Sequence, residues 1–167
     1  MLAFAFYLLE QADADPTVFV YPDGEHAKQF DIIAFLKEGG FHRAEGVGTT
    51  AYGGRYVRGH QTIVVHPKSG QGDVVGTLGA QRIVGECKGG TINSSHAGHK
   101  SRLRKGLSEL IGQLMMLAET GDRQVAVLPY TPEIDRLAER LAPRCRRAGI
   151  EVALVDQAGK VRFIGTQ

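Results

Sequence analysis

The amino-acid sequence predicts an α/β domain, and three observations lead to this prediction. Short apolar runs rich in β-branched residues recur over 61–66, 73–78 and 81–88, separated by glycine-bearing turns. A helical pattern follows over 102–119, where leucines, an isoleucine and an alanine recur on one face. A strand over 124–128 then leads into another helix, so strands and helices alternate in the second half of the chain.

The elements before the first of these runs are predicted in the same way. Residues 1–9 are apolar and are expected to pack as an N-terminal element. Residues 16–24 form a short β-branched and aromatic strand closed by a Pro-Asp-Gly turn. A buried helix is expected over 25–38, ended by Gly39-Gly40. Seven glycines between 39 and 59 favour a mobile loop, a ribbon or an arm.

The three strands over 61–66, 73–78 and 81–88 are expected to form an antiparallel meander. Near the C-terminus, Thr131-Pro132-Glu133 supplies a cap, a proline at the first helical position and an acid in the first turn. That helix should run to about residue 148, with a terminal hairpin after it formed by 151–155 and 161–164.

Length and charge place the chain among single globular domains. Its 167 residues fit one domain over 1–167, and the composition excludes disordered, coiled-coil and membrane-spanning classes. Residues 1–31 hold six acids and one base, which leaves twelve acids against nineteen bases for the rest. Such a basic body suits a polyanionic partner. The two cysteines form no CxxC, so a reducing cytoplasm is expected, without a membrane association or a structural zinc.

The segment 72–90, GDVVGTLGAQRIVGECKGG, carries the chemistry. Glu86 and Lys88 project on one face of their strand, because side chains alternate, and Cys87 projects on the other. If 73–78 and 81–88 pair about Gly79-Ala80, Asp73 lies near Glu86. Two carboxylates with the backbone carbonyl of Cys87 would offer oxygen ligands to Mg²⁺ or Mn²⁺. With Lys88 beside the ion, this predicts phosphodiester hydrolysis.

In this context the segment resembles the PD-(D/E)XK nucleases, which include restriction endonucleases and Holliday-junction resolvases. The resemblance implies a restriction-endonuclease-like core, α-β-β-β-α-β, with a mixed central sheet flanked by helices. It covers about 25–128 and leaves 129–167, with a helix and a hairpin, as a C-terminal elaboration.

The resemblance also implies roles for particular residues. Asp73 and Glu86 resemble the metal-binding acids and Lys88 the catalytic lysine, while Gln113 resembles a glutamine that several members place near the site. The chain departs from the family at Gly72, where the family name puts a proline. It departs again in the first helix, where a glutamate is replaced by Gln29 and Asp31 is a possible substitute metal ligand. A first-turn acid that favours the helix dipole is the preferred interpretation of Asp31.

Basic residues near the motif are expected to contact a nucleic-acid backbone. No acid occurs between Lys88 and Ser108, and the cations there are Lys100, Arg102, Arg104 and Lys105. Arg55 and Arg58 belong to the glycine-rich ribbon and are assigned to the same surface. The glycines match no dinucleotide or Walker pattern, so no nucleotide cofactor is expected.

Together these features predict a Mg²⁺- or Mn²⁺-dependent endonuclease acting on DNA, leaving 5′-phosphate and 3′-hydroxyl ends by family resemblance. DNA is chosen because of the family and because no aromatic stacking motif for single-stranded RNA occurs. Three alternatives stay open: an RNA-cleaving nuclease or toxin of the same fold, a non-catalytic nucleic-acid-binding subunit, and a structural assembly protein. Cutting both strands would need two sites, so a homodimer is plausible.

Overall fold

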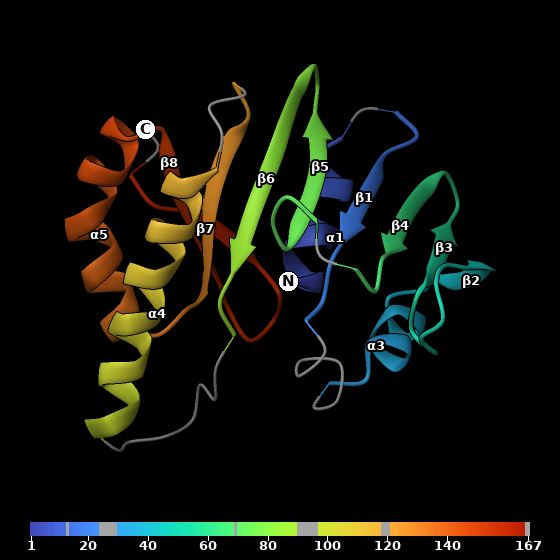
Figure 1. Cartoon of the computed structure of the whole chain (residues 1–167), viewed down its shortest axis with the longest axis horizontal. Coiled ribbons are helices and arrows are strands. Elements are labelled where there is room, and N and C mark those ends of the chain that lie inside the picture. Colours follow the sequence, from blue (N-terminus) through green and yellow to red (C-terminus); the bar gives the residue numbers. More distant parts are fainter. Residues whose placement is uncertain (13, 24–29, 69, 90–96, 118–120, 166–167) are drawn as a thin grey trace.

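The computed structural model describes residues 1–12, 14–23, 30–68, 70–89, 97–117 and 121–165, with the backbone alone for 97–103 (Figure 1). Within these residues the chain forms one mixed nine-stranded sheet with four helices. The sheet therefore confirms an α/β architecture. In the described part of the chain, no helix is long and apolar enough to cross a membrane.

The strands lie in the order β2-β3-β4-β1-β5-β6-β7-β8-β9. Their bounds along the chain are β1 Thr17–Val20, β2 His42–Gly46, β3 Gly54–Arg58, β4 Gln61–Val65, β5 Val74–Leu78, β6 Gln81–Cys87, β7 Arg123–Pro129, β8 Ile150–Val155 and β9 Val161–Phe163. β1 runs parallel to β4, and β6, β7 and β8 run parallel to one another, whereas the other neighbours are antiparallel.

Two helices pack on each face of the sheet. α1 (Leu2–Gln11) and α3 (Ile32–Glu38) share a core with β1, β4 and β5, and Figure 1 shows α1 behind these strands. α4 (Ala97–Met116) and α5 (Pro132–Arg147) pack against β7 and β8 on the opposite face. The helices α4 and α5 are the crossovers of two successive parallel β-α-β units, as connections between parallel strands require.

The predicted meander of 61–66, 73–78 and 81–88 is wrong in its first pairing. β5 and β6 form the expected hairpin about Gly79-Ala80, but β4 does not pair with β5. Instead β1 lies between them, parallel to β4 and antiparallel to β5. The alternating apolar pattern of β4 indicates a strand but does not indicate which strand lies beside it. The position next to β4 is occupied by β1, from the N-terminal region.

Other elements differ from prediction mainly in extent. Only 32–38 of the predicted helix over 25–38 is described as α3, and 24–29 lie outside the described residues. The glycine-rich stretch 39–59 contains the hairpin β2–β3. α4 spans 97–116 instead of the predicted 102–119, so it begins five residues earlier, and 118–119 lie outside the described residues.

The ends of the last helix were predicted correctly. Thr131 accepts a hydrogen bond from the amide of Ile134 at 3.1 Å, and Gly149 adopts a φ of 74° directly after the helix. The hairpin β8–β9 that follows also confirms the prediction.

Candidate active site at the ends of β5 and β6

The hairpin register brings Asp73 and Glu86 together. Val74 pairs with Gly85, and the amide of Asp73 donates to the carbonyl of Gly85 at 2.9 Å. Asp73 therefore stands across from Glu86, one position beyond the last paired residues. This is the register that the sequence predicted.

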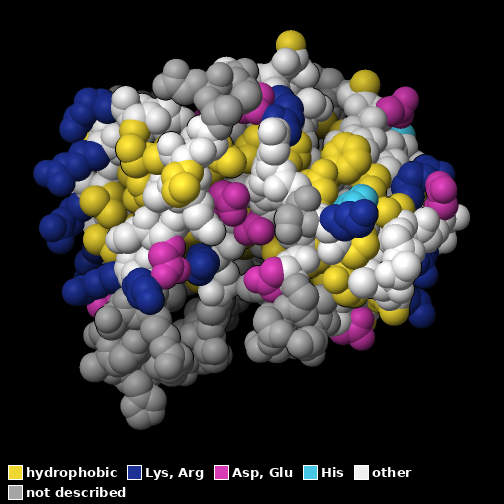
Figure 2. Space-filling view, in the orientation of Figure 1, with side chains coloured by type: hydrophobic (Ala, Val, Ile, Leu, Met, Phe, Trp, Pro, Cys, Tyr) yellow, Lys and Arg dark blue, Asp and Glu magenta, His cyan; other side chains and the backbone are white. Residues whose placement is uncertain are grey.

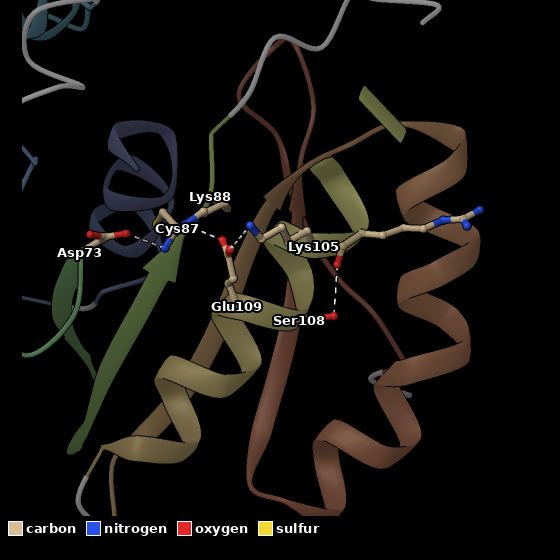
Figure 3. Close-up of polar contacts among 7 residues, drawn as sticks. Asp73, Cys87, Lys88, Lys105, Ser108 and Glu109 are labelled. Carbon is tan, nitrogen blue, oxygen red and sulfur yellow. Dashed lines mark hydrogen bonds and ion pairs between the residues drawn. The ribbon is translucent and has the colours of Figure 1, made fainter. Parts of the chain in front are cut away.

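The carboxylate of Asp73 is held by the backbone of the neighbouring strand. Its Oδ2 accepts a hydrogen bond from the amide of Cys87 at 2.8 Å (Figure 3). The carbonyl of Asp73 also accepts a hydrogen bond from the amide of Tyr21 at 2.9 Å, so both neighbouring strands fix this residue. One carboxylate oxygen is thus oriented before any ligand arrives.

Glu86 is half-buried on the face of the sheet that carries α4. Its strand partner on β7 is Ala126, which belongs to the core beneath α4 and α5. Burial, together with the neighbouring charge of Asp73, raises the pKa of Glu86 to about 7 against the opposing effect of Lys88. A pair of carboxylates with one raised pKa is typical of a site that binds a cation or moves a proton.

Gly72 lets the two acids approach each other. It adopts a φ of 105°, and a Cβ built there would lie 2.6 Å from Val84 Cγ1 and 3.7 Å from Glu86 Oε1. Proline has a φ near −65° and cannot take this conformation. The backbone conformation therefore explains why this position holds glycine and not the proline that the resemblance would place there.

Lys88 points toward α4, as Figure 3 shows. Its Nζ lies 3.2 Å from Glu109 Oε2, and its Cγ is 3.2 Å from the Cβ position of Gly106. The hydrogen bond from Lys88 is the main reason why the pKa of Glu109 lies below its ordinary value. Lys105 also approaches Glu109, with 3.7 Å between Nζ and Oε1.

Sequence reasoning missed Glu109. The available signal was its position four residues after Lys105 on the predicted helix, a spacing typical of an ion pair along a helix. That spacing explains the contact with Lys105 but does not show that Lys88, on another element, would reach the same carboxylate.

The other predicted site residues have varied surroundings. The side chain of Cys87 is buried on the α1 face, and burial raises the pKa of its thiol to about 11, so it is a core residue there. Asp31 caps α3, since its Oδ1 accepts a hydrogen bond from the amide of Ala34 at 2.9 Å. Gln113 is exposed on α4, one turn beyond Glu109.

The cations predicted to contact a nucleic-acid backbone fall into four groups. Arg104 and Lys105 are exposed on α4. Arg55 is exposed on β3 and lies 3.8 Å from Glu45. Arg58 instead packs 4.5 Å over the ring of Phe41 and donates to Gly39 O and Gln61 Oε1, so contacts within the chain account for it. The side chains of Lys100 and Arg102 lie outside the described residues.

The donor set of this site is small. Asp73 and Glu86 supply two carboxylates, and no group of three or more His, Cys, Asp or Glu side chains suited to a metal occurs among the described residues. Mg²⁺ is commonly bound through one or two carboxylates and keeps several waters. The two acids therefore fit a hydrated Mg²⁺ or Mn²⁺ and do not fit a fully protein-enclosed metal.

Comparison with known proteins adds no relative: no protein-family model, no curated protein and no solved structure matches this chain. The functional argument therefore depends on the geometry of the chain itself.

Proposed function

We propose that the protein is a divalent-metal-dependent nuclease that hydrolyses phosphodiester bonds of DNA. The observation that carries the proposal is the convergence of Asp73, Glu86 and Lys88 at adjacent ends of β5 and β6, on one face of the sheet. The raised pKa of Glu86 supports it, because a bound cation would favour the charged form of a carboxyl that burial and the neighbouring charge of Asp73 disfavour.

The order of the elements also supports the proposal. Taken in sequence, α1, β1, β5, β6, α4 and β7 form a helix, three successively antiparallel strands, a helix and a strand parallel to the third. This is the order that the resemblance to PD-(D/E)XK nucleases requires, reached with different residues. On this interpretation α3 and β2–β4 are an insertion between the first two core strands.

Each residue of the site has a distinct proposed role. Asp73, Glu86 and the carbonyl of Cys87 would hold the metal, which when bound polarises the phosphate and lowers the pKa of a bound water. Lys88 would orient the attacking water or stabilise the charge that develops on the phosphate. Glu109 would set the position of the Lys88 ammonium, to which it is paired at 3.2 Å.

Gln113 and Asp31 are less closely tied to the site. Gln113 shares α4 with Glu109 and is proposed to contact substrate near Lys88. Asp31 already satisfies an amide of α3, so a role as a third metal ligand would require it to leave that cap. A homodimer and a cytoplasmic location remain proposals from the sequence.

Incubation of supercoiled plasmid with the purified protein tests this function. We expect nicking or linearisation in Mg²⁺ or Mn²⁺, none in EDTA, and none with Asp73→Ala, while Asp122→Ala, which alters a carboxylate paired with Arg82 elsewhere, still cuts. Parallel assays with branched DNA and with RNA distinguish a DNA nuclease from the RNA-cleaving alternative, which would cut the RNA alone. A wild-type protein that binds nucleic acid but cuts none of these would favour the non-catalytic subunit.

A further inference from the structure

Part of the sheet face that carries the site is not covered by any described helix. α4 packs on β6 and β7, and α5 on β8, whereas α1 lies on the other side of β1, β4 and β5. Figure 1 shows β5, β1 and β4 without a helix in front of them. Figure 2 shows hydrophobic side chains on this part of the surface, with a histidine and basic side chains beside them.

Register identifies the side chains on this open face. Val18 and Val20 point into the core with Ile63 and Val65, so Phe19 projects to the opposite side with its partners Val64 on β4 and Val75 on β5. Phe19 has 38% of its surface exposed. Phe19 belongs to neither of the two core clusters of the described residues, so part of its ring is available to a ligand.

A second aromatic side chain connects this face to the site. Tyr21 follows Phe19 by two residues and lies across from Asp73, to which its amide donates. Its ring centroid is 6.0 Å from that of His66, the residue directly after β4. Phe19 is one strand and two residues from Asp73, about 8 Å at the usual sheet spacings. That is about the length of one nucleotide unit along a nucleic-acid strand.

Cations and donors surround the aromatic side chains. Arg55 shares a row with Val64 and Phe19, since Val64 is the register partner of both. His66 accepts the amide hydrogen of Lys68 at Nδ1, so its Nε2 carries the ring proton that can be donated. Glu45 lies 3.8 Å from Arg55 on this face, and Asp73 and Glu86 lie across from each other beside it.

We propose that this open face, defined by Phe19, Tyr21, Val64, Arg55 and His66, binds a single DNA strand that leads into the Asp73–Glu86 site. Phe19 stacks on the base one nucleotide from the scissile phosphate, and Arg55 and His66 contact the backbone. Aromatic side chains beside cations bind single strands without sequence preference, because every base has a π-face on which an aromatic ring can stack. That face is accessible when the base is unpaired. The inference rests on the proposed function and adds that the DNA next to the scissile phosphate is unpaired when it is bound, as in the transiently open segments of a supercoiled plasmid.

Fluorescence anisotropy with a labelled oligothymidylate strand in EDTA tests the surface without cutting. We expect Phe19→Ala to weaken binding about tenfold, the scale of one lost stack, and Phe19→Trp to retain it. Tyr130→Ala is the matched control, because Tyr130 is also 38% exposed but stands at the end of β7 against Arg162. A base-paired hairpin of equal length should bind with little dependence on Phe19.

Two results would overturn the inference. One is an unchanged affinity for the single strand in Phe19→Ala, with the fold verified by thermal unfolding. The other is a wild-type dimer in sedimentation that Phe19→Ala dissociates, which would assign the face to a second copy of the chain. Metal-dependent cutting is measured separately. If the wild type does not cut, the proposed nuclease activity is wrong, whereas the binding surface can still be correct. If the wild type cuts and Phe19→Ala binds the single strand with unchanged affinity, only the binding surface is wrong.

Discussion

The ammonium of Lys88 lies 3.2 Å from the carboxylate of Glu109, which joins the end of β6 to the middle of α4 (Figure 3). Both side chains are about two-fifths exposed, so the pair adds little to stability. The ion pair instead holds the Lys88 ammonium on the face of the sheet that carries Asp73 and Glu86. The ion pair makes Glu109 a positioning residue for the proposed catalytic lysine.

Glu109→Gln should lower the rate of metal-dependent cutting with little change in DNA affinity. Loss of the carboxylate frees the Lys88 ammonium to sample other rotamers, and we expect a decrease of about tenfold in turnover. Glu139→Gln, an exposed glutamate on α5, is the control. Equal decreases in both variants, or a decrease in affinity alone, would contradict a positioning role.

Glu86 should make the stability of the metal-free protein depend on pH. Its pKa is about 7 in the folded chain against 4.5 ordinarily, so the folded state binds more protons between these values. The free energy of unfolding should therefore fall as pH rises through this window, by ~1 kcal/mol once the partial exposure of the carboxyl is allowed for. Urea unfolding of wild type and Glu86→Gln on both sides of the window measures this. An equal dependence in the variant would assign it to other groups.

Arg104 and Lys105 should contribute to DNA binding through phosphate contacts. Replacing both by alanine should weaken binding and reduce the slope of log affinity against log salt by about 0.7 to 0.9 per cation lost. Lys37→Ala on α3 should leave the slope unchanged, because that helix packs on the other face of the sheet. Salt titrations of affinity check this, and an unchanged slope in the double variant would remove α4 from the interface.

Gly72→Ala should destabilise the protein through its backbone conformation and through contact with β6. A φ of 105° is strained for alanine, and the new Cβ would stand 2.6 Å from Val84. We expect a loss of about 1 to 3 kcal/mol in the free energy of unfolding. Gly112→Ala on α4, where a Cβ meets nothing within 4 Å, should be neutral or stabilising. Chemical denaturation of both variants provides the comparison.

Local signals were sufficient to predict the hairpin and the pairing of Asp73 with Glu86. Gly79-Ala80 marks the turn, and a two-residue turn sets the register of everything before it. The cap at Thr131 and the stop at Gly149 were equally local. These features depend on residues within about one turn or one strand of each other, which sequence patterns describe well.

Long-range placement could not be predicted in the same way. Nothing in the pattern of β1 shows that it inserts between β4 and β5, and this insertion is what places Phe19 and Tyr21 beside Asp73. The sequence therefore indicated no aromatic surface near the site. Glu109 was missed for a related reason, because its contact with Lys88 depends on how α4 crosses the end of β6.

The central claim is that Asp73 and Glu86 together hold a divalent ion. Isothermal titration calorimetry with Mn²⁺ tests this claim directly when the wild-type protein is compared with Asp73→Asn and Glu86→Gln. We predict one site in the wild type, a proton released on binding near pH 6 as the raised pKa of Glu86 falls, and a large loss of affinity in each variant. Equal Mn²⁺ affinity in wild type and both variants would contradict the account.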